Sequence, residues 1–194
     1  MNKTPEIFYL QNVAQVDTYV NLRSDLKTDC WKYGVVTINA EGFGVEDGSH
    51  IWYTDMVKNR WNEVLLQDVI DKLELLAPET KKYNFKSLDA YACARTFGLD
   101  GNIHVDKEFE FSSKGDGYMT FCYFPSDEWQ PEWGGELQFF DNAGNVIASY
   151  YPMPNTCVVF DSNIPHRGLA PSRDCKEVRK HITFKVFVNK MIQD

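Results

Sequence analysis

Hydrophobic residues follow two periods along this 194-residue chain, a helical one near its beginning and a strand-like one from about residue 88 onward. Residues 15–27 place four apolar side chains at helix-like spacing, namely Val16, Tyr19, Val20 and Leu22. Residues 61–76 keep the same helical period at Val64, Leu65, Val69, Leu73 and Leu76. Pro78 predicts the end of this second helix, because proline cannot continue the helical hydrogen-bond ladder.

Strand signals surround and follow these helices. Residues 33–40, YGVVTINA, predict a strand, and residues 42–50, GFGVEDGSH, predict a turn-rich loop. Short aromatic and β-branched runs follow, separated by Gly, Pro, Asn and Asp, at residues 88–97, 117–124, 135–141, 145–152, 156–161 and 179–188. The Asn142–Gly144 stretch predicts a hairpin turn.

Strands at this spacing indicate a mainly β (α+β) fold, a jelly roll or similar double-sheet barrel, with the N-terminal helices covering one sheet. We expect a single domain over residues 1–194, with a helix-containing part at 1–87 and a β core at 88–190. The helical part belongs with the core because alone it would bury only one face.

Composition and charge narrow the class of protein. No apolar run approaches the roughly 20 residues that span a bilayer, and the N-terminus lacks the layout of a signal peptide. We therefore expect a cytoplasmic protein with no membrane partner, in the host cytoplasm if the chain is viral. The net charge of −8 argues against binding to a nucleic-acid backbone but permits a basic peptide partner. The five cysteines form no CxxC pair, and Cys122 and Cys157 lie in apolar runs typical of a reduced core.

Two histidines and one aspartate predict a metal site. In an extended segment, His104 and Asp106 point to the same face and can reach one ion. His166 follows the predicted strand 156–161 by a few residues. Two imidazoles and a carboxylate form the facial triad that suits non-haem iron(II). An HxD triplet alone is a weak signal, since a surface histidine beside an aspartate has the same pattern.

Arg179 is a candidate anion-binding residue. Alternation along residues 179–184 places Arg179, His181 and Thr183 on one face, with Lys180 and Ile182 on the other. An arginine inside a barrel needs an anion, and its fork fits a carboxylate with two parallel hydrogen bonds. The alternative is a strand-edge arginine in a surface salt bridge.

Taken in order, four segments resemble the prolyl 4-hydroxylase-like superfamily of iron(II)- and 2-oxoglutarate-dependent dioxygenases, small bacterial and phage members included. The segments are HVD, the stretch 115–140 with its WGGEL, the stretch 152–172 with PMPN, FD and H, and VRKHITFKVF at 178–187. The resemblance covers about residues 88–188 and implies a double-stranded β-helix, the cupin-like jelly roll of that family.

The resemblance also implies roles for individual residues. His104, Asp106 and His166 match the iron ligands, and Arg179 matches the residue that binds 2-oxoglutarate. Thr183 matches a polar position near that arginine, and Leu137 an apolar residue that packs on the oxoacid. Gly134 and Gly135 are expected to permit close approach at the start of a strand.

The chain departs from the family at the distal end of the oxoacid. Phe124 stands where a tyrosine hydroxyl normally helps to hold the distal carboxylate. His181, where the family often has a small residue, either replaces that hydrogen bond or fills core beside Arg179. Tyr91 and Tyr118 are the other candidates for the missing hydroxyl.

The implied activity is hydroxylation of an unactivated C–H bond with O2, releasing succinate and CO2, with ascorbate as a supporting reductant. The substrate is expected to be a peptidyl prolyl or other protein side chain, or alternatively a free amino acid or other small molecule. Arg167 and Trp133 are candidate substrate contacts, and residues 44–54 and 107–117 are expected near the mouth. Two further alternatives remain, a non-catalytic jelly roll with a structural metal and a zinc hydrolase with Glu136 as base.

Overall fold

A seven-stranded antiparallel sheet forms the frame of the protein in the computed structural model, which describes residues 6–28, 31–34, 50–56, 60–107 and 116–191. Its strands run in the order β1-β8-β5-β10-β4-β3-β2. They are β1 (Ile7–Gln11), β2 (Lys32–Gly34), β3 (Ile51–Asp55), β4 (Tyr83–Arg95), β5 (Gly117–Phe124), β8 (Thr156–Asp161) and β10 (Arg179–Lys190). The central strand β10 pairs with β4 on one side and with β5 on the other.

A three-stranded sheet, in the order β7-β6-β9, lies against the large one. Its strands are β6 (Leu137–Phe140), β7 (Val146–Tyr150) and β9 (His166–Gly168). The turn between β6 and β7 is the predicted hairpin, with Gly144 at φ 84° and its N–H donating to the carbonyl of Asp141. Phe139 and Phe160 meet edge to face between the two sheets. The prediction of a double-sheet, jelly-roll fold is therefore confirmed.

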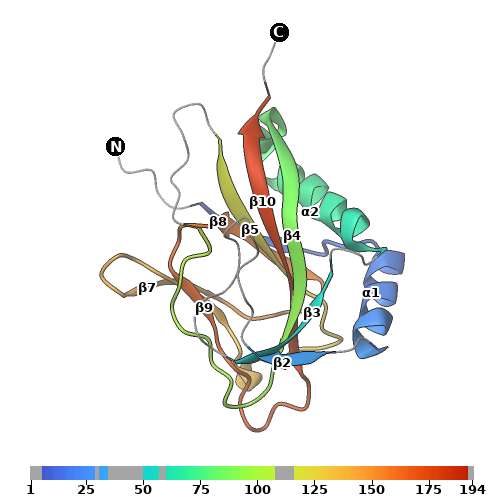
Figure 1. The fold of residues 1–194 in the computed structure, drawn as a ribbon, viewed down its shortest axis with the longest axis vertical. Helices are drawn as coiled ribbons and strands as arrows, with labels where there is room; N and C mark the ends of the chain where they lie inside the picture. The colour runs from blue at the N-terminus through green and yellow to red at the C-terminus, as the bar shows by residue number, and fades with distance from the viewer. Residues whose placement is uncertain (1–5, 29–30, 35–49, 57–59, 108–115, 192–194) are drawn as a thin grey trace.

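Two helices, α1 (Val16–Thr28) and α2 (Asn62–Leu76), cover the outer face of the large sheet (Figure 1). The predicted helices are confirmed, and a short 3-10 turn, η1 (Pro78–Lys82), begins at the predicted stop. The second 3-10 turn, η2 (Pro131–Trp133), precedes β6. Within the described residues, neither α-helix has the length and apolar character needed to cross a membrane.

The buried faces of the helices differ from the expected ones. In α1, Leu22 and Leu26 are buried, whereas Val16 and Val20 are 75% and 53% exposed. Residues two apart on a helix lie on roughly opposite sides, so a stripe through Leu22 leaves Val20 in solvent. In α2, the predicted Leu65, Val69 and Leu73 are buried, but Val64 and Leu76 are exposed.

The large sheet includes strands from both sides of residue 88. The strand β4 begins at Tyr83, and β1, β2 and β3 of the N-terminal part join the same large sheet as the core strands. The predicted strand 33–40 overlaps β2 only at Tyr33 and Gly34, because residues 35–40 lie outside the described ones, as do 42–49 of the predicted loop.

Two leucines of α2, one buried and one exposed, test this packing. Leu73→Ala should lower the free energy of unfolding by about 2–5 kcal/mol, because it leaves a cavity under a fully buried side chain. Leu76→Ala, at a position 59% exposed in the same helix, should change it by less than about 0.5 kcal/mol. Urea unfolding followed by circular dichroism measures both, and equal losses would contradict the assigned buried face.

Candidate metal centre and oxoacid pocket

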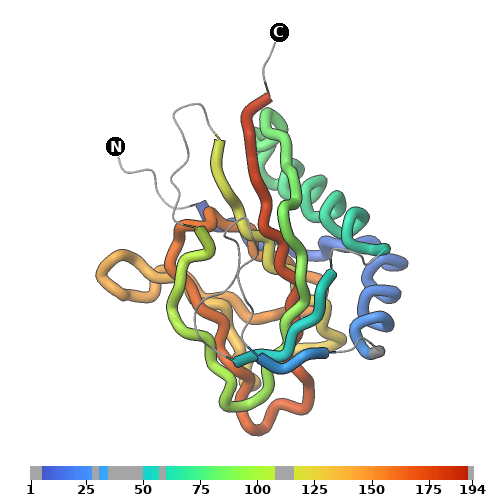
Figure 2. The backbone as a smooth tube through the Cα atoms, viewed as in Figure 1, coloured from blue at the N-terminus to red at the C-terminus, as the bar shows by residue number. Residues whose placement is uncertain are grey.

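A backbone bridge brings the two predicted metal-binding histidines together. The N–H of His104 donates to the carbonyl of His166 at 3.0 Å, and the N–H of His166 donates back to His104 at 2.9 Å. Figure 2 shows the chain after β4 running beside β9, where this exchange takes place. Residues paired in this way are direct neighbours, and the two imidazole rings lie 4.4 Å apart.

Backbone carbonyls orient both imidazoles toward the site. The Nδ1 of His104 lies 3.0 Å from the carbonyl of Asn102, and the Nδ1 of His166 lies 2.8 Å from that of Ile164. A carbonyl only accepts, so each Nδ1 carries the proton and each Nε2 keeps a lone pair for a metal. Each Nε2 lies 3.6 Å from one oxygen of Asp106.

The carboxylate of Asp106 is buried between these imidazoles. Thr120 Oγ1 donates to Oδ2 at 2.5 Å and lies 3.0 Å from Ser162 Oγ. The other oxygen, Oδ1, is buried and lies 2.5 Å from Lys185 Nζ. Burial alone would raise the pKa of Asp106, but Lys185 and the two histidines hold it well below its usual range.

These three side chains fit a divalent metal ion. Their ligand atoms all lie within 4.8 Å of one another. Burial lowers the pKa of His166 to about 4, so its imidazole is neutral and able to ligate. Two imidazole nitrogens and a buried carboxylate are the donor set of an iron(II) facial triad.

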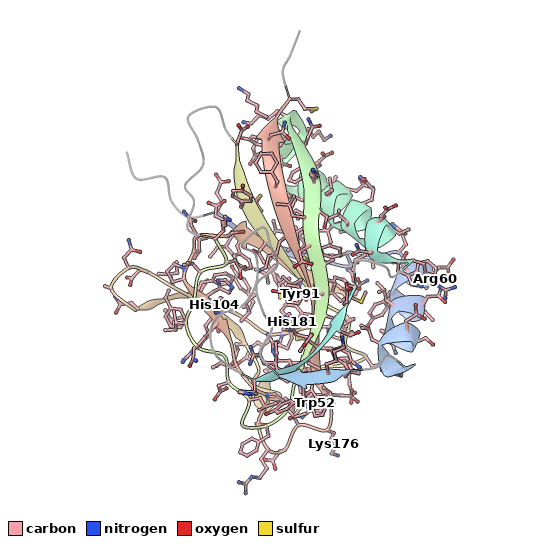
Figure 3. All side chains as sticks on the ribbon, viewed as in Figure 1. Trp52, Arg60, Tyr91, His104, Lys176 and His181 are labelled. Atoms are coloured by element: carbon pink, nitrogen blue, oxygen red, sulfur yellow. The ribbon has the colours of Figure 1, made fainter. Side chains whose placement is uncertain are left out.

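The triad opens into a pocket between the two sheets. Sixteen residues line it: Ile51, Tyr91, Cys93, Arg95, His104, Asp106, Thr120, Cys122, Leu137, Phe160, His166, Gly168, Arg179, His181, Thr183 and Lys185. The alternation predicted for residues 179–184 is confirmed, because Arg179, His181 and Thr183 face the pocket while Ile182 is in the core beneath the helices. Figure 3 shows Tyr91 and His181 near the middle of the molecule, with His104 to their left.

Arg179 is fully buried and enclosed by backbone at the end of the pocket. Its Nε donates to the carbonyl of Gly135 at 2.5 Å. A Cβ on Gly135, whose φ is +78°, would come within 3.2 Å of Arg179 Cδ, and one on Gly168 within 3.4 Å of Nη2. Glycine is thus required at Gly135 by both its backbone conformation and the guanidinium beside it. The close approach expected of this glycine is present.

His181 and Phe124 surround the same guanidinium. Arg179 Cζ lies 5.4 Å from the centroid of the Phe124 ring, a cation–π geometry. Arg179 Nη1 lies 3.0 Å from His181 Nδ1. Arginine only donates, so this Nδ1 accepts and the proton of the neutral ring is on Nε2. Burial, together with Arg179, holds the pKa of His181 well below its usual value.

Not every predicted residue lies in the pocket. Leu137, Thr183, Tyr91 and Ile51 line it, but Tyr118 does not and packs on Phe187. Arg167 Nε donates to Gln138 and its guanidinium stacks on Phe140, and Trp133 is buried edge to face against Trp129. Neither of these candidate substrate contacts is among the lining residues, nor is Glu136, the base that a zinc hydrolase would need. Most of the second predicted mouth segment, residues 108–115, lies outside the described residues.

The sequence did not predict several pocket residues, among them a threonine and two cations that bear on the site. Thr120 and Lys185 both contact Asp106, and Arg95 faces Arg179 across the β4–β10 pairing. Lys185 could have been predicted from the sequence, because strict alternation from Arg179 places it on the pocket face. Arg95 Nη1 donates to the carbonyl of Leu99 at 2.8 Å.

Comparison with known proteins identifies one family and several similar folds. The model of the 2OG-Fe(II) oxygenase superfamily matches residues 91–187, half of the chain. A prolyl-4-hydroxylase from Pseudomonas putida is 16% identical, with a TM-score of 0.56 over 97% of this chain and 95% of that one. A prolyl hydroxylase from Trichoplax adhaerens, solved with a peptide of hypoxia inducible factor, is 15% identical, with a TM-score of 0.61 over 93% and 83%.

Enzymes of another kind are equally similar in fold. The carbocyclase SnoK of nogalamycin biosynthesis is 10% identical, with a TM-score of 0.64 over 95% of this chain and 80% of that one.

Among curated sequences, leucine–tRNA ligases from Arabidopsis thaliana and Schizosaccharomyces pombe are 26% and 24% identical over 76 and 167 residues. This chain spans only 7% and 15% of their length, so they carry no argument about its activity.

The hydroxyl of Thr120 provides a test of the metal centre. Thr120→Val removes the hydrogen bond that orients Asp106 and should weaken Mn2+ binding on the order of 10- to 100-fold. Thr156→Val is the control, since Thr156 is equally buried but donates to the carbonyl of Met153 outside the pocket. Competition with a chelator measures both affinities, and equal values would show that Thr120 does not support the metal ligand.

Proposed function

Because the chain belongs to the 2OG-Fe(II) oxygenase superfamily, we propose that it hydroxylates an unactivated C–H bond of a peptidyl prolyl or other protein side chain. Its cofactor is iron(II) and its cosubstrate is 2-oxoglutarate, in keeping with the family and the His-Asp-His triad. When bound, the iron supplies the redox chemistry that couples decarboxylation of the oxoacid to activation of dioxygen.

Arg179 carries the proposed mode of cosubstrate binding. Its guanidinium is 1% exposed and faces the metal pocket, and no carboxylate of a described residue forms an ion pair with it. A buried cation in this setting is stable only if an anion arrives, and a dicarboxylate that also chelates the metal brings one. Arg179 therefore binds the distal carboxylate of 2-oxoglutarate.

The neighbours of Arg179 complete the oxoacid site. The Nε2–H of His181 donates to the same distal carboxylate, in place of the tyrosine hydroxyl that Phe124 lacks. Thr183 offers a hydroxyl on the same face of β10, and Leu137 packs on the methylene chain. Tyr91 also lines the pocket and is the second candidate to donate a hydroxyl to the distal carboxylate. Tyr118 packs on Phe187 outside the pocket and is not proposed for this role.

Peptide and small-molecule substrates each have support from similar structures. The bacterial prolyl-4-hydroxylase and the Trichoplax enzyme with its peptide share this fold, which favours a protein substrate. SnoK and the epimerase SnoN, with TM-scores of 0.64 and 0.62, favour a small-molecule hydroxylase as the second candidate. A non-catalytic jelly roll with a structural metal would not require a cation such as Arg179 at the end of its metal pocket.

The anchor role of Arg179 can be tested by binding alone. Arg179→Met should raise the Kd of 2-oxoglutarate on the Fe(II)-loaded protein by at least about 30-fold, because it leaves the distal carboxylate buried without a partner. The visible charge-transfer band of the anaerobic chelate reports binding. The same variant should bind 2-oxopentanoate, which lacks that carboxylate, as well as the unmodified protein does.

Arg173→Met is the matched control, because Arg173 is an exposed arginine stacked on Phe97 away from the pocket. It should leave both affinities unchanged. An unchanged Kd for 2-oxoglutarate in Arg179→Met would refute the anchor, and absence of the band in the unmodified protein would refute the proposed cosubstrate chemistry.

A succinate-release screen distinguishes the two substrate classes. Proline-containing peptides should stimulate succinate formation above the uncoupled rate, and mass spectrometry should show a gain of one oxygen atom on the peptide. Stimulation by free amino acids or other small acids, with none by peptides, would replace the first candidate with the second.

A further inference from the structure

A lysine lies at the metal end of the pocket. Lys185 is 1% exposed, and its ammonium lies 2.5 Å from Asp106 Oδ1 and 5.8 Å from the centroid of the Tyr91 ring. It stands six residues beyond Arg179 on the same face of β10. The strand therefore presents a cation at each end of the pocket.

Lys185 and a bound metal ion compete for the same carboxylate. Oδ1 of Asp106 is one of the oxygens that the triad offers, and it lies 3.6 Å from His104 Nε2. A divalent cation there attracts the carboxylate and repels the ammonium. Lys185 then needs another anion to stay charged, because burial of an ammonium without a counterion favours the neutral amine.

The pocket offers no such anion from its own described residues. Asp106 is the one carboxylate among the described residues that line it, whereas Arg179 and Lys185 are both cationic. Burial raises the pKa of Cys93 and Cys122 to about 12, so neither thiol supplies negative charge. Even with a divalent metal and dianionic 2-oxoglutarate bound, positive charge remains in excess.

We propose that Lys185 binds a carboxylate beside the metal, supplied either by the metal-side end of 2-oxoglutarate or by the substrate. This inference rests on the proposed function and assigns Lys185 to ligand binding, not only to stabilising Asp106. If the carboxylate is the substrate's, the substrate is an acid, either a small molecule or an acidic peptide. If it is the cosubstrate's, both ends of 2-oxoglutarate are held by cations of one strand.

Metal and oxoacid affinities of Lys185→Met test the proposal. Without oxoacid, this variant should bind Mn2+ several-fold more tightly, because the competing ammonium is gone. If the cosubstrate is the source, 2-oxoglutarate should bind the Mn2+-loaded variant at least about tenfold more weakly. Isothermal titration calorimetry measures both. Lys180→Met is the control, since Lys180 precedes His181 on the opposite face of β10 and should change neither affinity.

Crystals of the unmodified protein with Mn2+, 2-oxoglutarate and acetate decide between the sources and do not depend on the variant folding. Lys185 Nζ should leave Asp106 and lie within hydrogen-bond distance of a carboxylate oxygen, of 2-oxoglutarate for the first source or of acetate for the second. An ammonium that stays on Asp106, or that contacts neither ligand, overturns the proposal. Failure of the unmodified protein to bind 2-oxoglutarate would instead overturn the proposed function.

Discussion

The buried carboxylate of Asp106 is the constraint around which the inner face of this protein is organised. Among the described residues it is the one negative charge lining a pocket that also holds three cations. The close neighbours stabilise that charge through different contacts. Thr120 donates to it from β5, Lys185 faces it from β10, and the two histidines turn their Nε2 atoms toward it. A buried charge is tolerated only when its surroundings are arranged in this way.

Much of the fold was predictable because its signals are local. Alternating aromatic and β-branched runs predicted the long strands, and Gly144 marked the hairpin between β6 and β7. The buried face of α1 was not predictable, since apolar residues occur on both sides of that helix and only the sheet decides which side is covered. The short strand β1 exists because β8 offers it a partner nearly 150 residues later in the chain.

The candidate site likewise has residues that the sequence predicts and contacts that it does not. His104, Asp106, His166 and Arg179 belong to motifs of fixed spacing, so their types and order carried the prediction. The contact between Thr120 and Asp106 depends on how a loop meets β5, which no spacing expresses. At the distal end of the pocket, the sequence has Phe124 where a tyrosine was expected. The structure shows what the residues at that end contact. The aromatic face contacts the guanidinium, while the neighbouring imidazole of His181 accepts from it.

The position of β10 has a consequence for how the protein assembles during synthesis. This strand is the last of the described chain to leave the ribosome, yet it lies at the centre of the large sheet, between β4 and β5. Until it arrives, β4 and β5 have unpaired edges toward each other, and the apolar residues beneath the helices lack their central layer. Pairing of β10 with β4 and β5 is long-range and completes the centre of the sheet. Arg179, His181 and Lys185 enter with that pairing, so the oxoacid pocket can form only when the sheet closes.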